Sequence, residues 1–284
     1  MTTLALCIPH RPDVPARVEN LARLLAQLGG FGNAPGERLH VLGERLPNRE
    51  WARRMWRWGV ASGADFFLTL QDDTELAPRF LDCLRALLPS LPRSAILGLG
   101  GHHPGLRQAA APWARSRHWV VGWAYGMWLP TLAGLVDFDA SGAHPQLTED
   151  SLVNTYAGAH GLDVWHPVPS LVDHRTDFPS TYGNDGAQPF RRSHVRWEGH
   201  DPAWLTDPGY WRPRGGALPP LLQHPTYASV QGAQNGPPAA PGFQHTVMAS
   251  HTGVGHCPHC GGQLRHADTC PTQKESHDVR RVRR

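Results

Sequence analysis

Apolar and polar positions alternate along the first 180 residues with two different periods. Short apolar runs, which predict buried strands, cover residues 3–8, 39–42, 66–70, 95–99, 118–123 and 164–166. Between these runs, apolar side chains recur at the spacing of one helix face: Val18, Leu21, Leu25 and Leu28, then Trp51, Met55 and Trp58, then Leu81, Leu84 and Leu88. Strands that alternate with helices of this length predict an α/β fold, a three-layer sandwich around a mostly parallel central sheet.

Residues that start and stop helices fall between these segments. The Gly29-Gly30 pair ends the first helix, Asn48 is suited to cap the second, and Gly63 ends it before the third strand. Pro78 is suited to the first turn of the next helix, so we expect that helix to begin there. These signals agree with the periodicity and support the same elements.

The periodicity fades beyond about residue 180, where the composition also changes. Residues 201–245 contain many prolines, with glycine, glutamine and tryptophan between them, and show no convincing helical pattern. We therefore expect an α/β domain over residues 1–200, a Pro/Gly-rich linker or wrapping segment over 201–250, and a small C-terminal module over 251–284.

The composition is that of a globular protein. Of the 284 residues, 40% are hydrophobic and 18% are charged, which excludes a disordered chain. No apolar stretch approaches the roughly 20 residues that span a bilayer, and residues 1–7 lack the basic start of a secretory signal. We therefore expect a cytoplasmic protein without a transmembrane segment.

Positive charge gathers in the last part of the chain. Residues 1–180 contain 16 basic and 17 acidic residues, whereas residues 181–284 contain 11 and 7, so their net charges are −1 and +4. The excess ends in a basic tail at residues 280–284. Such a tail is usually only solvated, and contact with nucleic acid or another polyanion is the alternative.

The most informative segment is the third apolar run and the residues that follow it, Gln71-Asp72-Asp73. A buried strand that ends in carboxylates carries negative charge to the edge of the sheet where α/β proteins bind ligands. Two neighbouring carboxylates repel one another unless a positive group lies between them. A Mg²⁺ or Mn²⁺ ion that bridges to a diphosphate meets this requirement. The alternative is that the acids only begin a loop, with Asp73 or Thr74 as a cap.

A second acidic pair, Glu149-Asp150, follows Thr148, which is suited to cap a helix. Acids in a first helical turn complement the helix dipole, so a purely structural role is one interpretation. The other is chemical, because transfer of a group to a hydroxyl needs a carboxylate that removes the hydroxyl proton.

The segment around the first acidic pair resembles the GT-A family of nucleotide-sugar-dependent glycosyltransferases. The shared features are a helix, the Ala64-Asp65 turn, an apolar strand and an acidic motif of the Asp-x-Asp type, in which Gln71 replaces the first acid. The resemblance implies a GT-A-like fold. It also implies that Asp73 holds a catalytic Mn²⁺ or Mg²⁺ ion and that Asp72 binds the donor.

Two later motifs follow in the order that this family shows. Inverting GT-A enzymes carry a Glu-Asp motif, and the resemblance assigns the catalytic base to Asp150, with Glu149 as the alternative. The Pro-Ser-Leu-Val-x-His string that ends at His174 is similar to the end of the catalytic core in bacterial and phage GT-A transferases. By this resemblance His174 completes the metal shell, since imidazole is a natural ligand, and Arg175 neutralises the leaving diphosphate. A structural histidine is the alternative.

Further residues are candidates for donor and acceptor binding. Arg11, with Asp13 nearby, lies where the first strand of this family meets the nucleotide, so it is a donor-site candidate; an ordinary loop is the alternative. Trp123 and Tyr125 belong to a segment rich in glycine and aromatic residues. They are acceptor-site candidates because aromatic rings stack on sugar faces, and core packing is the alternative.

The C-terminal module has a pattern of its own, with the spacing Cys-x2-Cys-x5-His-x3-Cys at Cys257, Cys260, His266 and Cys270. A Cys-x2-Cys turn allows both thiolates to face one ion, so we expect a structural Zn²⁺ that folds a segment without a core of its own. The spacing is similar to that of a retroviral-type zinc knuckle, with the histidine one residue later. A disulfide with a spare thiol is the alternative. Three other histidines compete for the fourth ligand position: His256, His259 and His277.

Together these motifs predict a metal-dependent glycosyltransferase that moves a sugar from a nucleotide-diphosphate donor to an acceptor hydroxyl, with inversion. The acceptor is a glycan, a lipid-linked molecule or modified DNA. A nucleotidyltransferase also uses strand-end carboxylates and Mg²⁺, but it usually carries a glycine-rich phosphate loop, and residues 7–14 contain no glycine. A non-catalytic nucleic-acid-binding zinc protein, built on the C-terminal module and the basic tail, is the second alternative.

Overall fold

The structure is a computed structural model, and most of its described residues belong to the α/β part of the chain. The described residues are 2–101, 103–109, 112–117, 119–175, 193–213, 215 and 217–222, with the backbone of 255–256 and 263–264. The chain divides into two units, residues 1–144 with 148–234, and residues 145–147 with 235–284. The domain boundaries predicted at residues 200 and 250 stay predictions.

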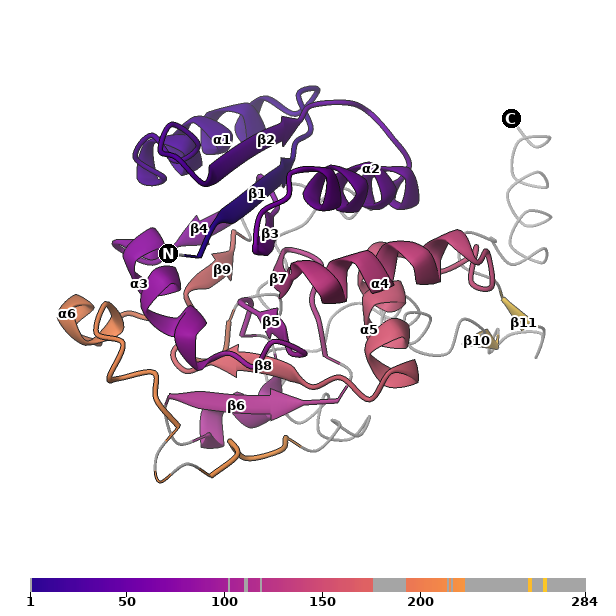
Figure 1. Ribbon diagram of the computed structural model, residues 1–284. Helices are drawn as coiled ribbons and strands as arrows, with labels where there is room; N and C mark the ends of the chain where they lie inside the picture. Colours follow the sequence, from indigo (N-terminus) through magenta and orange to yellow (C-terminus); the bar gives the residue numbers. More distant parts are fainter. Residues whose placement is uncertain are drawn as a thin grey trace, which may run out of the picture. The chain divides into compact units, whose positions relative to one another are not determined.

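The α/β prediction is confirmed by a seven-stranded sheet in the order β2-β1-β3-β7-β5-β8-β6 (Figure 1). β1 runs parallel to β2 and β3, and β5 runs parallel to β8. β7 is antiparallel to β3 and β5, and β6 is antiparallel to β8, so the sheet is mixed. The strands are β1 (Leu4–Pro9), β2 (Glu37–Leu42), β3 (Phe66–Leu70), β5 (Ile96–Gly98), β6 (Trp113–Ser116), β7 (Ala124–Trp128) and β8 (Val164–Pro167).

Helices cover both faces of this sheet, which gives three layers. In Figure 1, α2, α4 and α5 lie on one side of β1, β3 and β7, and α1 and α3 lie on the other. The described helices are α1 (Pro15–Gln27), α2 (Asn48–Ala61), α3 (Phe80–Leu87), α4 (Leu129–Ala140), α5 (Glu149–Ala159) and the single turn α6 (Pro202–Leu205), with short 3-10 helices at Leu88–Ser90 and Pro104–Gln108. None of them has the length and hydropathy that a membrane-spanning helix needs.

The core on the side of α1 and α3 is one continuous cluster. Leu4, Leu6 and Ile8 of β1 belong to it, as do alternate residues of β3, because successive side chains of a strand point to opposite faces. The helices add apolar side chains: Leu24 of α1 with Leu28, its C-cap residue, and Phe80, Leu84 and Leu87 of α3. Of the residues predicted to face inward, Leu28, Leu84 and Leu88 are buried, whereas Leu21, Leu25 and Leu81 are only partly buried.

On the other face, α2 lies close to the sheet at Gly59. A β-carbon built at Gly59 would lie 2.5 Å from Cδ2 of Phe67 in β3 and 2.8 Å from Cδ2 of Leu132 in α4. Both distances are below ordinary van der Waals contact. The missing side chain at this position therefore sets how closely α2 and α4 approach the sheet.

The strand predicted over residues 118–123 is wrong for the described residues 119–123, and the strand of this region begins at Ala124. Asn154 of α5 provides the physical reason. The N–H of Val120 donates to Oδ1 of Asn154 (2.7 Å), and the C=O of Val120 accepts from Nδ2 of Asn154 (3.1 Å). The side chain of Asn154, rather than a neighbouring strand, therefore makes the hydrogen bonds of the Val120 backbone.

A second difference follows the acidic pair, where the sequence predicted a helix that begins at Pro78. The chain first forms a short strand, β4 (Thr74–Leu76), which pairs antiparallel with β9 (Val172–His174). α3 then begins at Phe80, after Arg79 with a φ of 57°. The pairing brings the end of the Pro-Ser-Leu-Val-x-His motif to the acidic pair.

The register of β4 and β9 places two acids opposite one another. Thr74 lies opposite His174, and Glu75 lies opposite Asp173. Facing acids on paired strands repel, and Arg196 compensates this pair, with its Nε 2.9 Å from Asp173 and its Nη2 3.3 Å from Glu75. The opposite face of this ribbon is free to carry His174 toward the acidic turn.

Replacing Gly59 by alanine is expected to destabilise the fold. Alanine favours a helix over glycine by up to about 1 kcal/mol, but overpacking a tight contact costs about 1–3 kcal/mol, so the steric cost should win. We expect the Tm of Gly59→Ala to fall by a few degrees in a thermal melt. Gly43→Ala is the control, because its β-carbon would lie 3.9 Å from Cδ2 of His10, in ordinary contact. Equal Tm values for both variants would show that α2 can shift at no cost.

Candidate functional site

The carboxyl ends of β1 and β3 lie side by side at one edge of the sheet. The chain passes from β1 through α1 to β2 on one side, and then through α2 to β3 on the other side of β1. α/β proteins bind ligands in the crevice where the strand order changes direction in this way. We call this switch point the crevice, and the segments that lie there are residues 10–14 after β1 and residues 71–73 after β3.

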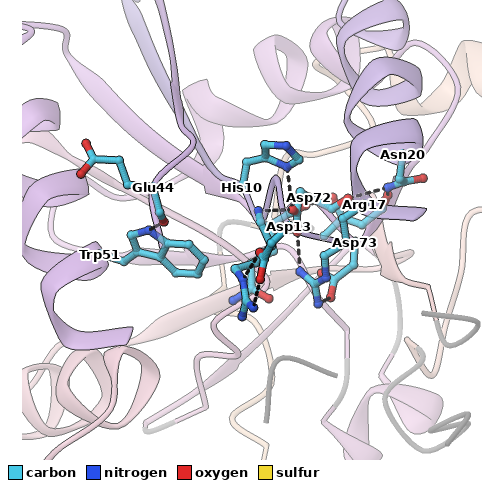
Figure 2. Close-up of polar contacts among 11 residues, drawn as sticks. His10, Asp13, Arg17, Asn20, Glu44, Trp51, Asp72 and Asp73 are labelled. Carbon is cyan, nitrogen blue, oxygen red and sulfur yellow. Dashed lines mark hydrogen bonds and ion pairs between the residues drawn. The ribbon is translucent and has the colours of Figure 1, made fainter. Parts of the chain in front are cut away.

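Asp72 is buried at this point, with 1% of its surface exposed, and both of its carboxylate oxygens are occupied. Oδ2 accepts a hydrogen bond from the backbone N–H of Arg11 (2.7 Å) and lies 2.8 Å from Nδ1 of His10. Oδ1 pairs with the guanidinium group of Arg17. Figure 2 shows His10 and Arg17 beside Asp72.

Asp73 is also buried, with 2% exposure. Its Oδ2 atom pairs with Nη2 of Arg17 and lies 3.2 Å from Nε2 of His174. Burial alone would raise the pKa of Asp73, but the interactions with His174 and Arg17 outweigh it and lower the pKa to about 2. The two adjacent carboxylates are therefore held by Arg17 and by two histidines of the protein itself.

Arg17 lies between the two carboxylates, and 4% of its side chain is exposed (Figure 2). It comes from the first turn of α1, which directly follows β1 and begins at Pro15. The periodicity had placed Val18 on the buried face of this helix, but Val18 is 44% exposed, and Arg17 and Asn20 are buried instead. The sequence interpretation missed Arg17; the signal was a charged residue in the first turn of the helix that follows β1.

Asn20, one helical turn after Arg17, holds the backbone of the acidic turn. Its Nδ2 donates to the C=O groups of Asp72 (2.8 Å) and Thr74 (2.9 Å). Its Oδ1 accepts from Nη1 of Arg175 (3.1 Å), and the backbone N–H of Arg175 donates to the C=O of Asp73 (2.9 Å). Arg175 therefore lies at this edge, where the sequence predicted it, and its contact with a diphosphate stays a prediction.

Strand β9 brings His174 to the acidic turn, so Asp73 and His174 lie together as the sequence predicted. The ring of Trp123 packs edge-on against His174, with 5.0 Å between ring centroids. The C=O of Trp123 accepts from the backbone N–H of Gln71 (2.8 Å). The segment before β7 therefore forms part of the same crevice.

Asp150 lies at the same edge, beside Gln71. A β-carbon built at Gly122 would lie 3.7 Å from Nε2 of Gln71 and 4.0 Å from Cγ of Asp150, so the two side chains flank one glycine. Asp150 is partly exposed, and its Oδ1 accepts hydrogen bonds from Oγ1 of Thr148 (2.7 Å) and the N–H of Ser151 (2.8 Å). The first turn of α5 therefore holds a carboxylate next to the acidic turn.

Glu149 precedes Asp150 in the sequence but is buried, with 4% exposure. Its Oε1 accepts from the hydroxyl of Tyr125 (2.7 Å), and its backbone N–H donates to Oδ1 of Asn48 (2.9 Å). Burial raises the pKa of Glu149 to about 8, against the lowering effect of the Tyr125 hydrogen bond. Glu149 is therefore mostly protonated at neutral pH and enclosed, and Asp150 is the better candidate for a base.

Tyr125 is not placed to bind an acceptor. Its side chain is fully buried, and its hydroxyl accepts from Nε1 of Trp56 (2.8 Å) and donates to Glu149. Burial raises the pKa of this phenol well above its usual value. The prediction that Tyr125 stacks on a sugar is wrong, because no part of its ring reaches solvent. Trp123, with 6% exposure, stays a prediction.

Arg11 contributes its backbone to the acidic turn, and its side chain pairs with Asp13. Nε of Arg11 lies 2.7 Å from Oδ1 of Asp13, and Nη2 lies 2.7 Å from Oδ2. This paired hydrogen bond lowers the pKa of Asp13 to about 2. The Arg11 side chain is partly exposed next to Asp72, and its contact with a donor stays a prediction.

The predicted Mn²⁺ or Mg²⁺ ion does not fit beside Arg17 in this arrangement. Asp72 uses both oxygens and Asp73 uses Oδ2 for the contacts described above. Only Oδ1 of Asp73 is left, a buried atom that no hydrogen-bond donor of the described residues reaches. The described part of the chain also contains no group of three His, Cys, Asp or Glu side chains that is arranged to hold a metal. The catalytic metal stays a prediction, and the contacts of Arg17 argue against it.

The predicted zinc site lies outside the residues that the structure describes. The backbone on either side of its first two cysteines is described, and there β10 (Gly255–His256) pairs antiparallel with β11 (Gln263–Leu264). The structural Zn²⁺ stays a prediction. Its four predicted ligands are Cys257, Cys260, His266 and Cys270.

The buried carboxyl of Glu149 predicts a pH dependence of stability. Its folded pKa of about 8 exceeds the ordinary value of 4.5, so the unfolded chain releases this proton first and stability falls as the pH rises between these two values. The loss is at most about 1.4 kcal/mol per pH unit. Glu149→Gln removes the titration, so its Tm should exceed that of the wild type increasingly from pH 5 to pH 8.

Glu19→Gln, at an exposed position of α1, is the matched control for this pH series. Its Tm should differ from that of the wild type by the same small amount at every pH. A Glu149→Gln curve that runs parallel to the wild-type curve would show that Glu149 is ionised in the folded protein.

Comparison with known proteins assigns no family. No protein-family model and no curated protein matches the chain. A solved glycosyltransferase involved in the glycosylation of the major capsid of PBCV-1 is 11% identical, with a TM-score of 0.35 over 52% of this chain and 71% of its own. The solved mannose-1-phosphate geranyltransferase from Thermus thermophilus is 16% identical, with a TM-score of 0.35 over 59% and 74%. At these scores neither structure assigns a fold or an activity, and the function proposed next rests on the residues of the site.

Proposed function

We propose that this chain is a glycosyltransferase that moves a sugar from a nucleotide-diphosphate donor to an acceptor hydroxyl. The main support is the meeting of three motifs from distant parts of the chain at one crevice of the sheet. These are the Asp72-Asp73 turn after β3, His174 on β9 and Asp150 on α5. The sequence had singled out the same three motifs through their resemblance to GT-A enzymes.

The donor diphosphate would bind at the side of the crevice that carries guanidinium groups. Arg17 is enclosed by the acidic turn, whereas the partly exposed Arg175 is held at the edge of the turn by Asn20, so Arg175 is the guanidinium group placed to meet a ligand. Guanidinium groups bind phosphate oxygens through paired, charge-assisted hydrogen bonds. Such contacts would also stabilise the negative charge that develops on the leaving diphosphate.

Asp150 would act as the general base in a direct displacement. The acceptor oxygen forms a bond to the anomeric carbon while the bond from that carbon to the diphosphate oxygen breaks, and the hydroxyl proton passes to Asp150. This displacement inverts the configuration at the anomeric carbon. Thr148 and Ser151 hold one oxygen of Asp150, which fixes the orientation of the carboxylate.

Donor binding can be tested with the full chain and a panel of UDP-, GDP-, dTDP- and CMP-sugars in a thermal-shift assay. A rise of Tm with one member identifies the donor nucleotide, and release of its nucleotide in the presence of an acceptor demonstrates transfer. Release of pyrophosphate from a nucleoside triphosphate and a sugar phosphate would show a nucleotidyltransferase instead. No response to any of these, together with salt-sensitive binding of DNA or RNA, would favour a nucleic-acid-binding protein.

Asp150→Asn is expected to lower kcat by about 100-fold or more, because a general base contributes about 10²–10⁴-fold. The Tm rise with the donor should be unchanged, since the donor phosphates bind elsewhere in the crevice. Asp137→Asn, at an exposed acid of α4, is the matched control and should keep wild-type turnover. Wild-type turnover in Asp150→Asn would reduce Asp150 to a structural residue of the first turn of α5.

A further inference from the structure

Arg17 occupies the position that the sequence assigned to a divalent cation. One guanidinium nitrogen pairs with Asp72 and another pairs with Asp73, so the group bridges the two carboxylates as a metal ion would. The side chain is 4% exposed and leaves α1 at its first turn. Asn20, on the same face of α1, binds the backbone on both sides of Asp73, which fixes α1 relative to the acidic turn.

The oxygens of this site show what Arg17 displaces. Asp72 is saturated by Arg17, His10 and the N–H of Arg11. Asp73 presents Oδ2 to Arg17 and His174, while its buried Oδ1 faces no donor among the described residues. An unsatisfied carboxylate oxygen inside the protein is costly, and it marks the point at which a cation would bind if the guanidinium group were absent.

The charges lead to the same conclusion. Two carboxylates and one guanidinium group carry a net charge of −1 before the histidines are counted. A divalent ion added to them would bring the site to +1 and would lie within a few ångströms of a buried positive group. Without Arg17, the same ion would bring the carboxylates to neutrality. Arg17 and a divalent ion are therefore alternatives at this site.

We propose that Arg17 is the resident cation of the Asp72–Asp73 pair, and that this pair binds no divalent metal ion while Arg17 is present. The charge that offsets the two carboxylates is then built into α1, and a nucleotide-sugar binds without a metal ion at this pair. This last consequence rests on the function proposed above, whereas the exclusion of metal by Arg17 does not depend on it. Arg17 is a positioning residue in this proposal, because it orders the carboxylates that line the crevice.

The test is a titration of the full chain with Mn²⁺, in which electron paramagnetic resonance reports the free ion. The wild type and Asp73→Asn should take up the same amount of Mn²⁺, because the acid pair of the wild type binds none. Arg17→Ala should bind one Mn²⁺ at least about tenfold more tightly than the wild type, since a competing buried charge is gone. If Arg17 served only the stability of the fold, Arg17→Ala would be less stable than the wild type but would gain no Mn²⁺ site.

Two variants control this measurement. Arg23→Ala, at an exposed position of α1, should behave as the wild type. The double variant Arg17→Ala/Asp73→Asn should lose the gained site. The C-terminal cysteines and histidines are present in every variant, so any Mn²⁺ that they take up is a common background.

Arg17→Ala leaves two buried carboxylates without their partner and is expected to be less stable, so its melting is measured as well. A ligand that binds only the folded state stabilises it, and Mn²⁺ at about 100-fold excess over Kd should raise the Tm of Arg17→Ala by about 5 °C or more. The same Mn²⁺ should leave the wild-type Tm unchanged.

Two outcomes would overturn the proposal. One is a wild-type protein that binds a Mn²⁺ ion which Asp73→Asn removes, because the acid pair would then hold metal beside Arg17. The other is an Arg17→Ala protein, folded by circular dichroism, that binds no more Mn²⁺ than the wild type. A chain that gains the Mn²⁺ site in Arg17→Ala but transfers no sugar would refute the proposed function and leave this inference standing.

Discussion

Burial of two adjacent carboxylates at the end of β3 is the constraint on which the crevice depends. Asp72 and Asp73 are almost fully enclosed, and unpaired charges cannot be held in such a place. Three separate elements therefore converge on one turn: the loop after β1 brings His10 and a backbone N–H, α1 brings Arg17, and β9 brings His174. The crevice forms because these two buried acids need hydrogen-bond and ion-pair partners.

The division of labour between Glu149 and Asp150 follows from helix geometry. Consecutive residues of a helix point about 100° apart, so when one carboxyl of the first turn enters the core, the next is carried to the edge. Burial makes the inner carboxyl neutral, and it joins Tyr125 and Trp56 in a hydrogen-bonded chain between α2, β7 and α5. The outer carboxyl keeps contact with solvent and with the crevice. The same dipeptide thus supplies a structural acid and a candidate base.

The sequence predicted local features well where they depended on neighbouring residues. Strand β3 begins and ends at the predicted residues, because an apolar run stops abruptly at charged ones. α2 begins near the predicted position, but Pro47 is its N-cap, and the side chain of Asn48 accepts from the N–H of Glu149 instead of capping the helix. The predictions failed where distant groups decide. Asn154 keeps residue 120 out of the sheet, burial of the ring removes Tyr125 from the acceptor site, and the acidic turn draws Arg17 inward in place of Val18. A charged residue in the first turn marked Arg17 as unusual, but nothing in α1 itself identified its partner, a turn 55 residues later.

The pairing of β4 with β9 has a consequence for the accuracy of folding. Successive residues of β9 point to opposite faces, so Asp173 turns toward Arg196 while His174 turns toward Asp73. A slip of one position that brought Asp173 to the place of His174 would exchange the imidazole for a carboxylate and gather three acids around one guanidinium group. Repulsion among them would expel the misaligned strand. The charges of the site therefore also favour the correct register of β4 and β9, because they repel the carboxylate that this misaligned pairing would bring to them.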